Sequence, residues 1–417
     1  MKSKVDEKNF DVTFARRQFA FFKLDQSKQW SFFDNAGGTF ACSSVVNKLT
    51  RFYQANKVQP YGDNALAAAA GEQMDTGRRV ISELLGVPKE TLTLGPSTTQ
   101  NINTLSIACM AFLKMGDEII VSEQDHEANI GAWERVAQKT GATLNFWRIN
   151  AEDGELELAQ FEKLLNKRTK IVCVTHSSNI IGTVNPIQEI IRLGHNFGAK
   201  VVIDGVSYAP HRWPDISSVE PDAYCFSTYK TFGTHLGIMY IAPDFMEQLA
   251  PQCHFFNIDN PWARLDAAGP DHALIAALAG IGDFFGTLYD HHFGFSDKSL
   301  NHKAKKVSSI MNQHELSLCK ILIKALNQLP LRIIGKSSIK GREANISLIS
   351  STHSSSLLAS LLAKKGVAAK NGHFYAYRVL KALGIDTNDG VLRLSFAHYN
   401  SEEDTIRLID ALTAIFR

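Results

Sequence analysis

The sequence has few cysteines, and they are not arranged in pairs. The six lie far apart and never form a CxxC motif, which argues against a zinc site or a disulfide framework. They are Cys42, Cys109, Cys173, Cys225, Cys253 and Cys319. Several fall inside apolar runs, where a cysteine behaves as a small hydrophobic side chain. We therefore expect reduced thiols, no metal site and a cytoplasmic location.

Long apolar runs and a strong charge bias are also missing. No uninterrupted apolar stretch reaches the roughly 20 residues that a membrane-spanning helix needs. The polar start, residues 1–9, lacks the apolar segment of a signal peptide. The net charge is only +2, which gives no electrostatic basis for binding nucleic acid or an anionic membrane. We expect neither partner.

Several well-known cofactor and catalytic motifs are absent. There is no G-x-G-x-x-G between a first strand and helix, so a nicotinamide-dependent enzyme is not indicated. A P-loop, a nucleophile-elbow serine and an H-E-x-x-H motif are missing too. The sequence is therefore not typical of these enzyme classes.

A regular pattern of short apolar runs and helical segments is present. The chain has 417 residues, more than one hydrophobic core usually covers, so two domains are expected. Strand-like runs occur at residues 91–94, 118–122, 142–149, 170–174, 200–204 and 224–227. They are rich in valine and isoleucine and alternate with amphipathic helical patterns. This predicts an α/β fold with a largely parallel sheet covered on both faces.

The pattern changes after a polar, histidine-rich stretch at residues 291–305. Helices are expected at 306–328, 354–365, 375–383 and 401–416, and strands at 331–335, 345–350 and 391–397. This is typical of an α+β domain. We predict an N-terminal arm over residues 1–30, a large domain over 31–290 and a small C-terminal domain over 291–417.

Lys230 is the first candidate for chemistry. It follows an apolar run that ends at Phe226 and lies in a turn with Gly233 and Gly237. A lysine at a strand end, beside hydroxyls and glycines, could anchor a phosphate or form a Schiff base with a carbonyl cofactor. A solvated loop lysine is the alternative.

Asp204 and a run of hydroxyl residues are further candidates. Asp204 ends a strand-like run, at the position where open α/β sheets bind ligands. It could be a metal ligand, a base, the partner of a protonated ring nitrogen, or a loop cap. Ser97, Thr98 and Thr99 open a helix, where hydroxyls and free N–H groups form either an anion site or an ordinary N-cap.

Three other side chains occupy similar positions. His126 could be an acid or base, a flat stacking partner or a surface histidine. Asn179 lies in a loop after a strand. Arg393 lies in an apolar strand pattern and needs an anion, unless it occupies the exposed face of an edge strand. Each candidate follows a strand or opens a helix, so we expect them at one edge of the sheet.

With these residues in view, the chain resembles pyridoxal-phosphate (PLP) enzymes of fold type I, in the class-V aminotransferase group that includes cysteine desulfurases. The resemblance covers about residues 30 to 417. Its motifs are Asp-Asn-Ala-Gly-Gly at 34–38, Ser-Thr-Thr-Gln-Asn-Ile-Asn at 97–103, Asp-His-Glu-Ala-Asn at 125–129, Ser-Asn-Ile-Ile-Gly-Thr-Val-Asn-Pro at 178–186, Asp-Gly-Val-Ser-Tyr-Ala-Pro-His at 204–211 and Phe-Ser-Thr-Tyr-Lys-Thr-Phe-Gly at 226–233. It implies a mostly parallel seven-stranded sheet between helices, a smaller α+β domain against which the arm packs, and a homodimer.

The resemblance also implies a role for each candidate. Lys230 would hold PLP as the internal aldimine and later move the substrate's α-proton. Asp204 would pair with the ring nitrogen, and His126 would stack on the ring.

Further roles follow from the same resemblance. Phosphate contacts are implied for Thr98, Thr99, Ser227 and, as a helper, Ser207. Asn179 would orient the oxygen side of the ring or the substrate carboxylate, and Arg393 would clamp that carboxylate.

One departure bears on the reaction. Desulfurases of this type carry a mobile catalytic cysteine in a loop where this chain reads Lys-Asn-Gly-His-Phe-Tyr-Ala at 370–376, with Tyr375 about at the cysteine's position. Desulfuration through an enzyme persulfide needs a thiolate there. We therefore expect a branch that lacks this cysteine: a PLP enzyme acting on a small L-amino acid by lyase or aminotransferase chemistry.

Further substrate contacts and other reactions are also compatible with the sequence. His373, Tyr375 and His211 are further candidates for substrate contacts. The alternatives are a genuine cysteine desulfurase or selenocysteine lyase, an amino-acid racemase or epimerase, and a PLP-binding regulatory protein without catalysis.

Overall fold

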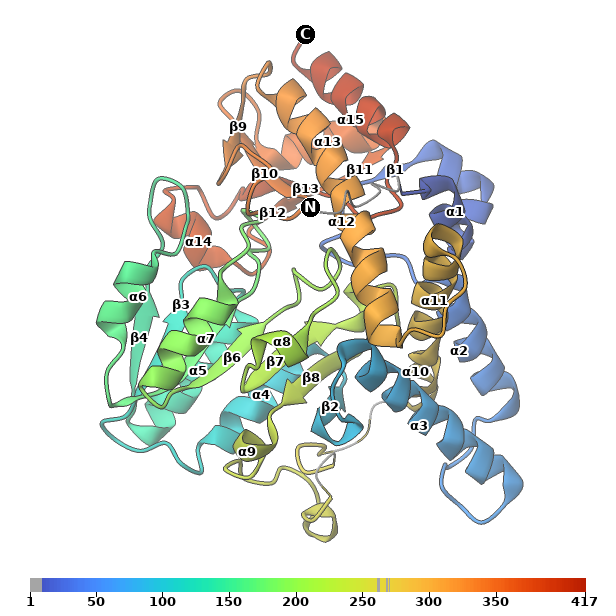
Figure 1. The fold of residues 1–417 in the computed structure, drawn as a ribbon. Coiled ribbons are helices and arrows are strands. Elements are labelled where there is room, and N and C mark those ends of the chain that lie inside the picture. The colour runs from blue at the N-terminus through green and yellow to red at the C-terminus, as the bar shows by residue number, and fades with distance from the viewer. Residues whose placement is uncertain (1–9, 261–262, 268, 270) are drawn as a thin grey trace, which may run out of the picture.

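The centre of the fold is a seven-stranded sheet in the order β2-β8-β7-β6-β5-β3-β4 (Figure 1). The computed structural model describes residues 10–260, 263–267, 269 and 271–417. The strands are β2 (Leu92–Gly95), β3 (Glu118–Ser122), β4 (Thr143–Trp147), β5 (Thr169–Thr175), β6 (Lys200–Asp204), β7 (Ala223–Ser227) and β8 (Gly237–Ile241). Strands β3 to β7 run parallel, and β8 is antiparallel to both of its neighbours. The predicted α/β sheet, mostly parallel and seven-stranded, is confirmed.

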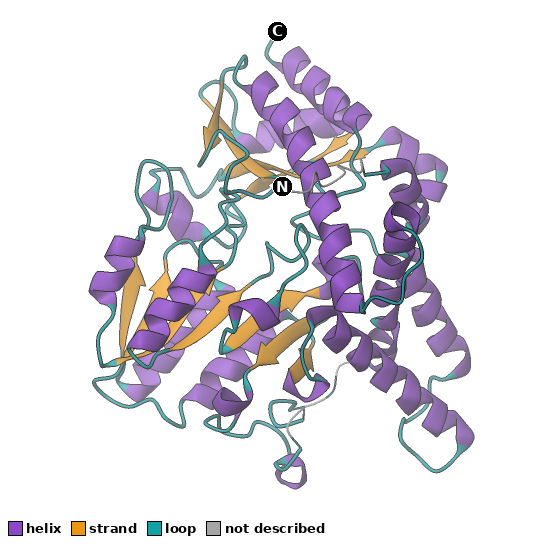
Figure 2. Ribbon diagram, viewed as in Figure 1, coloured by secondary structure: helices purple, strands orange, loops and turns teal. Residues whose placement is uncertain are grey.

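Alternate side chains of the strands pack into two cores, one on each face of the sheet. In β3, Ile119 and Val121 pack in the core that includes residues of α4 (Thr98–Cys109) and α5 (Ala128–Thr140). Ile120 packs in the other core, which includes residues of α7 (Ile187–Asn196). Figure 2 shows helices on both sides of the sheet. The remaining short helices here are α6 (Leu158–Leu164), α8 (Ile216–Val219) and α9 (Pro243–Met246).

A layer of helices lies beside the sheet. It comprises α2 (Ser43–Ala55), α3 (Ala65–Leu85), α10 (His272–Ala277) and α11 (Ala279–Phe293). Helices α10 and α3 pack so closely that a Cβ on Gly77 would lie 2.0 Å from the Ile275 carbonyl oxygen. The segment His272–Phe293 is long and apolar enough to cross a membrane, but 72% of its most apolar window is buried in the fold, as in a core helix.

The C-terminal part contains a four-stranded antiparallel sheet. Its order is β12 (Lys370–Gly372), β13 (Val391–Ser395), β10 (Asn345–Ser350) and β9 (Leu331–Ile334). Helices α13 (Ser355–Lys364) and α15 (Glu402–Ile415) contribute to its core, and α14 (Tyr377–Ala382) follows β12. The predicted α+β pattern is present, but the sequence pattern gave no sign of β12.

Helix α12 (Leu300–Leu326) belongs to two cores at once. Ala304, Val307 and Met311 pack in the core that α7 and α3 share, whereas Leu318 and Leu322 pack under the four-stranded sheet. The helix begins six residues before the predicted position 306, inside the stretch expected to be a polar boundary. Its amino-terminal turns carry a buried apolar stripe between charged residues. Because the charged residues dominate the composition there, the sequence pattern indicates a polar segment.

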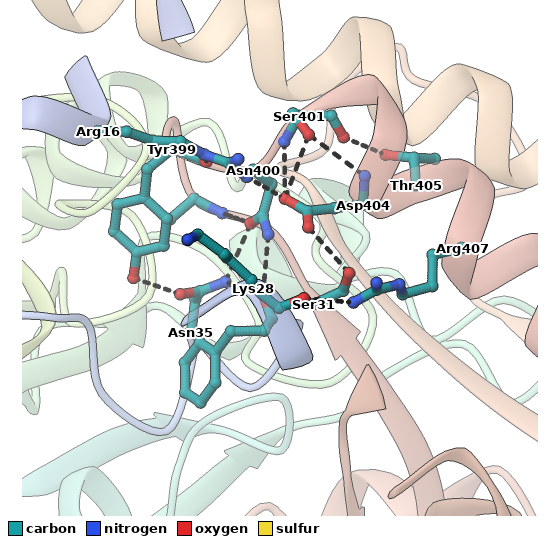
Figure 3. Close-up of polar contacts among 12 residues, drawn as sticks. Arg16, Lys28, Ser31, Asn35, Tyr399, Asn400, Ser401, Asp404, Thr405 and Arg407 are labelled. Carbon is teal, nitrogen blue, oxygen red and sulfur yellow. Dashed lines mark hydrogen bonds and ion pairs between the residues drawn. The ribbon is translucent and has the colours of Figure 1, made fainter. Parts of the chain in front are cut away.

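The N-terminal segment packs against the end of the chain (Figure 3). Helix α1 (Val12–Arg17) carries Arg16, whose Nε donates to the Tyr399 carbonyl oxygen at 2.7 Å and whose guanidinium pairs with Asp404. Strand β1 (Ser31–Phe32) pairs in parallel with β11 (Val367–Ala368), and Ser31 Oγ donates to Asp404 at 2.8 Å. These contacts fix the turn at residues 34–38 next to β13.

Candidate active site

Nine of the twelve candidate residues line one cavity of about 650 Å³ at the carboxyl edge of the large sheet. They are Thr98, Thr99, His126, Asn179, Asp204, Ser207, Ser227, Lys230 and Tyr375. The carboxyl ends of parallel strands meet at one edge, so loops distant in sequence converge there. Arg393, His373 and His211 do not line this cavity.

Lys230 ends a short 3₁₀ turn, Thr228–Lys230, directly after β7. The turn is held by Thr228, whose Oγ1 donates to the Thr234 carbonyl oxygen at 2.6 Å and whose own carbonyl accepts from Gly233 N at 2.8 Å. Burial, together with the Arg393 charge, lowers the pKa of Lys230 to about 8 against the opposing charge of Asp204. About a tenth of this amine is therefore neutral at pH 7, far more than for an ordinary lysine, and the neutral form is the one that acts as a nucleophile.

Asp204 is buried at the end of β6. One carboxylate oxygen accepts from Val206 N at 2.9 Å. Burial raises the pKa of Asp204 to about 6, while the Val206 hydrogen bond and the Lys230 charge lower it. A buried acid of this kind is suited to pair with a cationic ring nitrogen, because the partner's charge offsets the cost of burial.

His126 lies between β3 and α5, with its ring at the cavity. Its Nδ1 accepts from Ala128 N at 3.0 Å, which fixes the ring plane. Burial and the charges of Lys230 and Arg393 lower the pKa of His126 to about 4, so the ring is neutral and suited to stacking. The Tyr375 ring lies 5.1 Å away, centroid to centroid.

The amino-terminal end of α4 gathers hydroxyl groups beside the cavity. Ser97 caps this 12-residue helix by accepting from Gln100 N at 3.1 Å, and Thr98 Oγ1 lies 2.7 Å from Ser227 Oγ. A Cβ on Gly237 would lie 2.6 Å from Thr98 N, so only glycine lets β8 approach this turn. Hydroxyls and free N–H groups at a helix start favour a phosphate.

Arg393 is buried in the middle of β13, outside the cavity. Its Nη2 lies 3.2 Å from an Asp34 carboxylate oxygen, and its guanidinium carbon lies 3.7 Å from the centre of the Phe374 ring. Asn179 fixes the backbone at Phe374, because its Nδ2 donates to the Phe374 carbonyl oxygen at 2.9 Å. Asn179 Oδ1 is buried and has no hydrogen-bond partner among the described residues.

The other two candidates outside the cavity have local partners. His373 Nδ1 accepts from Tyr375 N at 3.1 Å. His211 is buried and lies 2.5 Å from a Glu315 carboxylate oxygen on α12. Together with Ser207 and Lys230, His211 lines a separate, very small cavity.

Sequence reasoning missed three residues of this region, Asp34, Phe374 and Glu315. Asp34 and Phe374 both belong to motifs that were recognised, but no contact with Arg393 could be read from them. Glu315 carried a usable signal, since it is an acid on the apolar stripe of a predicted helix, and such an acid needs a buried partner.

The donor set fits PLP. A carbonyl-bearing pyridine phosphate needs an amine, an acid for the ring nitrogen and an anion cradle, and Lys230, Asp204 and the start of α4 supply these around one cavity. Asn179 also lines this cavity, and its buried Oδ1 has no hydrogen-bond partner among the described residues.

None of the six cysteines lines the cavity. Five are buried and the sixth, Cys253, is partly exposed, and all are free thiols. The expectation that most of the cysteines are buried is therefore confirmed.

Comparison with known proteins agrees with the fold. The model of the class-V aminotransferases matches residues 31–255 and 286–408. The aminotransferase-like protein FGM3 of Gibberella zeae is 28% identical over 99% of this chain and 100% of its own length. A probable cysteine desulfurase of Mycolicibacterium paratuberculosis is 30% identical over 95% of this chain, which spans 57% of that protein.

A solved structure extends the similarity to three dimensions. The cysteine desulfurase CsdA of Escherichia coli has a TM-score of 0.82 and 25% identity, over 97% of this chain and 98% of that one. The resemblance drawn from the motifs is confirmed at the level of the family. The chain belongs to the class-V aminotransferase family, which consists of PLP-dependent enzymes.

Proposed function

We propose that this chain binds PLP covalently at Lys230 and acts on a small L-amino acid by lyase or aminotransferase chemistry. The observation that carries the proposal is the single cavity that gathers Lys230, Asp204 and the hydroxyl-rich start of α4. Family membership supports the same cofactor.

Each residue has a task in this proposal. When bound, PLP supplies an electron sink for the negative charge that develops at the substrate's α-carbon. Lys230 Nζ would bind the cofactor and then move the proton at that carbon. Asp204 would hold the ring nitrogen in its charged form, and neutral His126 would cover the ring face.

The remaining groups would orient the reactants. Thr98, Thr99 and Ser227, with Ser207, would hold the phosphate, and Asn179 would orient the ring oxygen or the substrate carboxylate. Arg393 would clamp that carboxylate through paired N–H···O bonds. His373, Tyr375 and His211 remain proposed contributors to substrate binding.

The position of Tyr375 supports a reaction without an enzyme persulfide. Tyr375 lines the cavity where the resemblance places a cysteine, and Cys253, the only partly exposed thiol, does not line it. We therefore place the chain in the branch without a catalytic cysteine. We also propose a cytoplasmic homodimer, and light scattering of the purified protein tests the dimer.

The cofactor proposal is tested by spectroscopy and mass spectrometry. The PLP-loaded protein should absorb at roughly 400–430 nm, and borohydride reduction should leave a stable adduct on the peptide that contains Lys230. Lys230→Ala should lose both signals, whereas Lys364→Ala, at the exposed end of α13, should keep them. A band that survives in Lys230→Ala contradicts the proposal.

The reaction is tested by its products. Amino acids are screened for release of sulfide, for keto acid and for inverted configuration, before and after alkylation of thiols. Sulfide from cysteine that survives alkylation supports lyase chemistry without a persulfide. Sulfide that disappears on alkylation shows that a cysteine takes part.

A further inference from the structure

The guanidinium of Arg393 already faces a carboxylate from its own chain. Asp34 contributes one contact at 3.2 Å, and the nearest carbonyl oxygen, that of Asn179, lies 3.5 Å from Nη1. Arg393 Nε is buried and has no hydrogen-bond partner among the described residues. A guanidinium can offer two parallel bonds to one carboxylate, so its donors are only partly used here.

Phe374 covers the same guanidinium. Its ring centre lies 3.7 Å from the guanidinium carbon, so the ring stacks on the flat face of the arginine. With Asp34 and Phe374 in place, Arg393 is 3% exposed and does not reach the cavity that Lys230 lines. In this arrangement the guanidinium offers almost no exposed surface to a substrate carboxylate.

Phe374 belongs to a segment stretched between the two sheets. Residues 373–378, called the strap below, follow β12, include the first two residues of α14 and cross to the large sheet. Asn179 donates to the Phe374 carbonyl oxygen at 2.9 Å, and Glu127 N donates to the Tyr375 carbonyl oxygen at 2.7 Å. At the end of the strap, Arg378 pairs with Glu127 and with Glu134, each at 3.2 Å.

The strap holds a backbone conformation that is unfavourable on its own. Phe374 and Tyr375 have φ angles of 49° and 58°, two successive side chains in the left-handed region. Such residues persist only where the surroundings impose them. The strap is thus strained, and the contacts with Glu127, Glu134 and Asn179 hold it closed.

We propose that the strap is a gate over Arg393, with Phe374 as the shield and Asp34 as the carboxylate that a substrate carboxylate replaces. This rests on the proposed function, because it concerns how an amino acid reaches Arg393. An amino acid binds fully only when the strap opens, whereas an amine without a carboxylate needs no opening. The gate thus acts on ligands that carry a carboxylate.

Chemical modification tests the gate without any cofactor. The full-length protein is treated with phenylglyoxal, and modification of Arg393 is followed by peptide mass spectrometry, with exposed Arg332 as the internal reference. If the gate is closed about nine-tenths of the time, phenylglyoxal modifies Arg393 about tenfold more slowly than in a protein with an open gate. Phe374→Ala and Arg378→Gln should therefore each raise the rate of Arg393 modification about tenfold. Arg378→Gln leaves the cover on Arg393 intact and only loosens the strap.

The control is Tyr377→Ala. Tyr377 is exposed and does not touch Arg393, so this variant should react like the wild type. Unchanged rates in both strap variants overturn the proposal.

A binding experiment tests the specificity. L-alanine and ethylamine differ by one carboxylate, and each is titrated against the PLP-loaded protein by its visible spectrum. Phe374→Ala and Arg378→Gln should tighten L-alanine about tenfold and leave ethylamine unchanged. Equal effects on both ligands, or none, contradict the gate. If neither ligand changes the wild-type spectrum, the proposed function fails, and the modification rates still decide the strap.

Discussion

Lys230 lies within the field of three charged side chains. Arg393 lowers its pKa, whereas Asp204 and Asp34 raise it, and burial makes the largest contribution, downward. Because the lysine acts through its neutral amine, these charges set the pH range in which it reacts.

The first prediction concerns the pH dependence of Lys230 in the protein without cofactor. Trapping of added PLP by cyanoborohydride at Lys230 should rise with pH with a midpoint near pH 8, because burial lowers the pKa of Lys230 to about 8. Asp34→Asn removes a negative charge and should shift the midpoint down, whereas Arg393→Met removes a positive charge and should shift it up. Peptide mass spectrometry gives the midpoint. A midpoint equal to that of the exposed Lys364 contradicts the assignment.

At the scale of single elements, the close approach of β8 to the start of α4 constrains the cavity. A Cβ on Gly237 would lie 2.4 Å from the Ser97 carbonyl carbon and 2.6 Å from Thr98 N. Backbone atoms cannot move aside as a flexible side chain can.

The second prediction follows from this contact. Gly237→Ala should lower the free energy of unfolding by about 1–3 kcal/mol and weaken phosphate binding at Thr98. The matched control is Gly286→Ala in α11, where an added Cβ meets nothing within 4 Å and should stabilise the helix by about 0.5–1 kcal/mol. Urea unfolding of the two variants measures both effects. Equal stability of the two would show that β8 can shift.

The elements of the large sheet were predictable because they carry strong local signals. The strands at 118–122 and 200–204 were predicted with the bounds that the structure has. The antiparallel direction of β8 was not predictable, since an apolar run has no sign of its direction. Strand β12, Lys-Asn-Gly, has no strand propensity and exists because it pairs with β13.

The candidate site was predictable in part for a related reason. Residues at strand ends must meet at one edge, so nine candidates converged on one cavity. Asp34 and Arg393 meet across the whole length of the chain, and this pairing depends on β1 docking beside β13. No local pattern encodes such a contact.

At the scale of the whole molecule, a buried cluster of charges joins the loop after β6 to α12. His211 lies 2.5 Å from Glu315, and Arg212 lies 2.9 Å from Glu343. Burial lowers the pKa of His211, but the charge of Glu315 outweighs it and the net shift is upward. Burial raises the pKa of Glu315 to about 7.

The third prediction is the pH dependence of stability. Both groups bind protons more tightly in the folded state than in the unfolded state, so their contribution is complete below their ordinary pKa values and is lost as pH rises through the folded values. The free energy of unfolding should therefore fall by the order of 1–3 kcal/mol between about pH 6 and about pH 8.5. The double variant His211→Gln with Glu315→Gln should show a flatter profile in urea unfolding at the two pH values. A free energy of unfolding that rises over this interval in the wild type would contradict the prediction.

Helix α12 also has a consequence for the order in which the chain folds during synthesis. Ala304, Val307 and Met311 complete the core on one face of the large sheet, although every strand of that sheet lies before residue 242. The ribosome must therefore release about 70 further residues after β8 before this core can close, in addition to those its exit tunnel covers. Until then the nascent chain exposes apolar surface that a chaperone can bind.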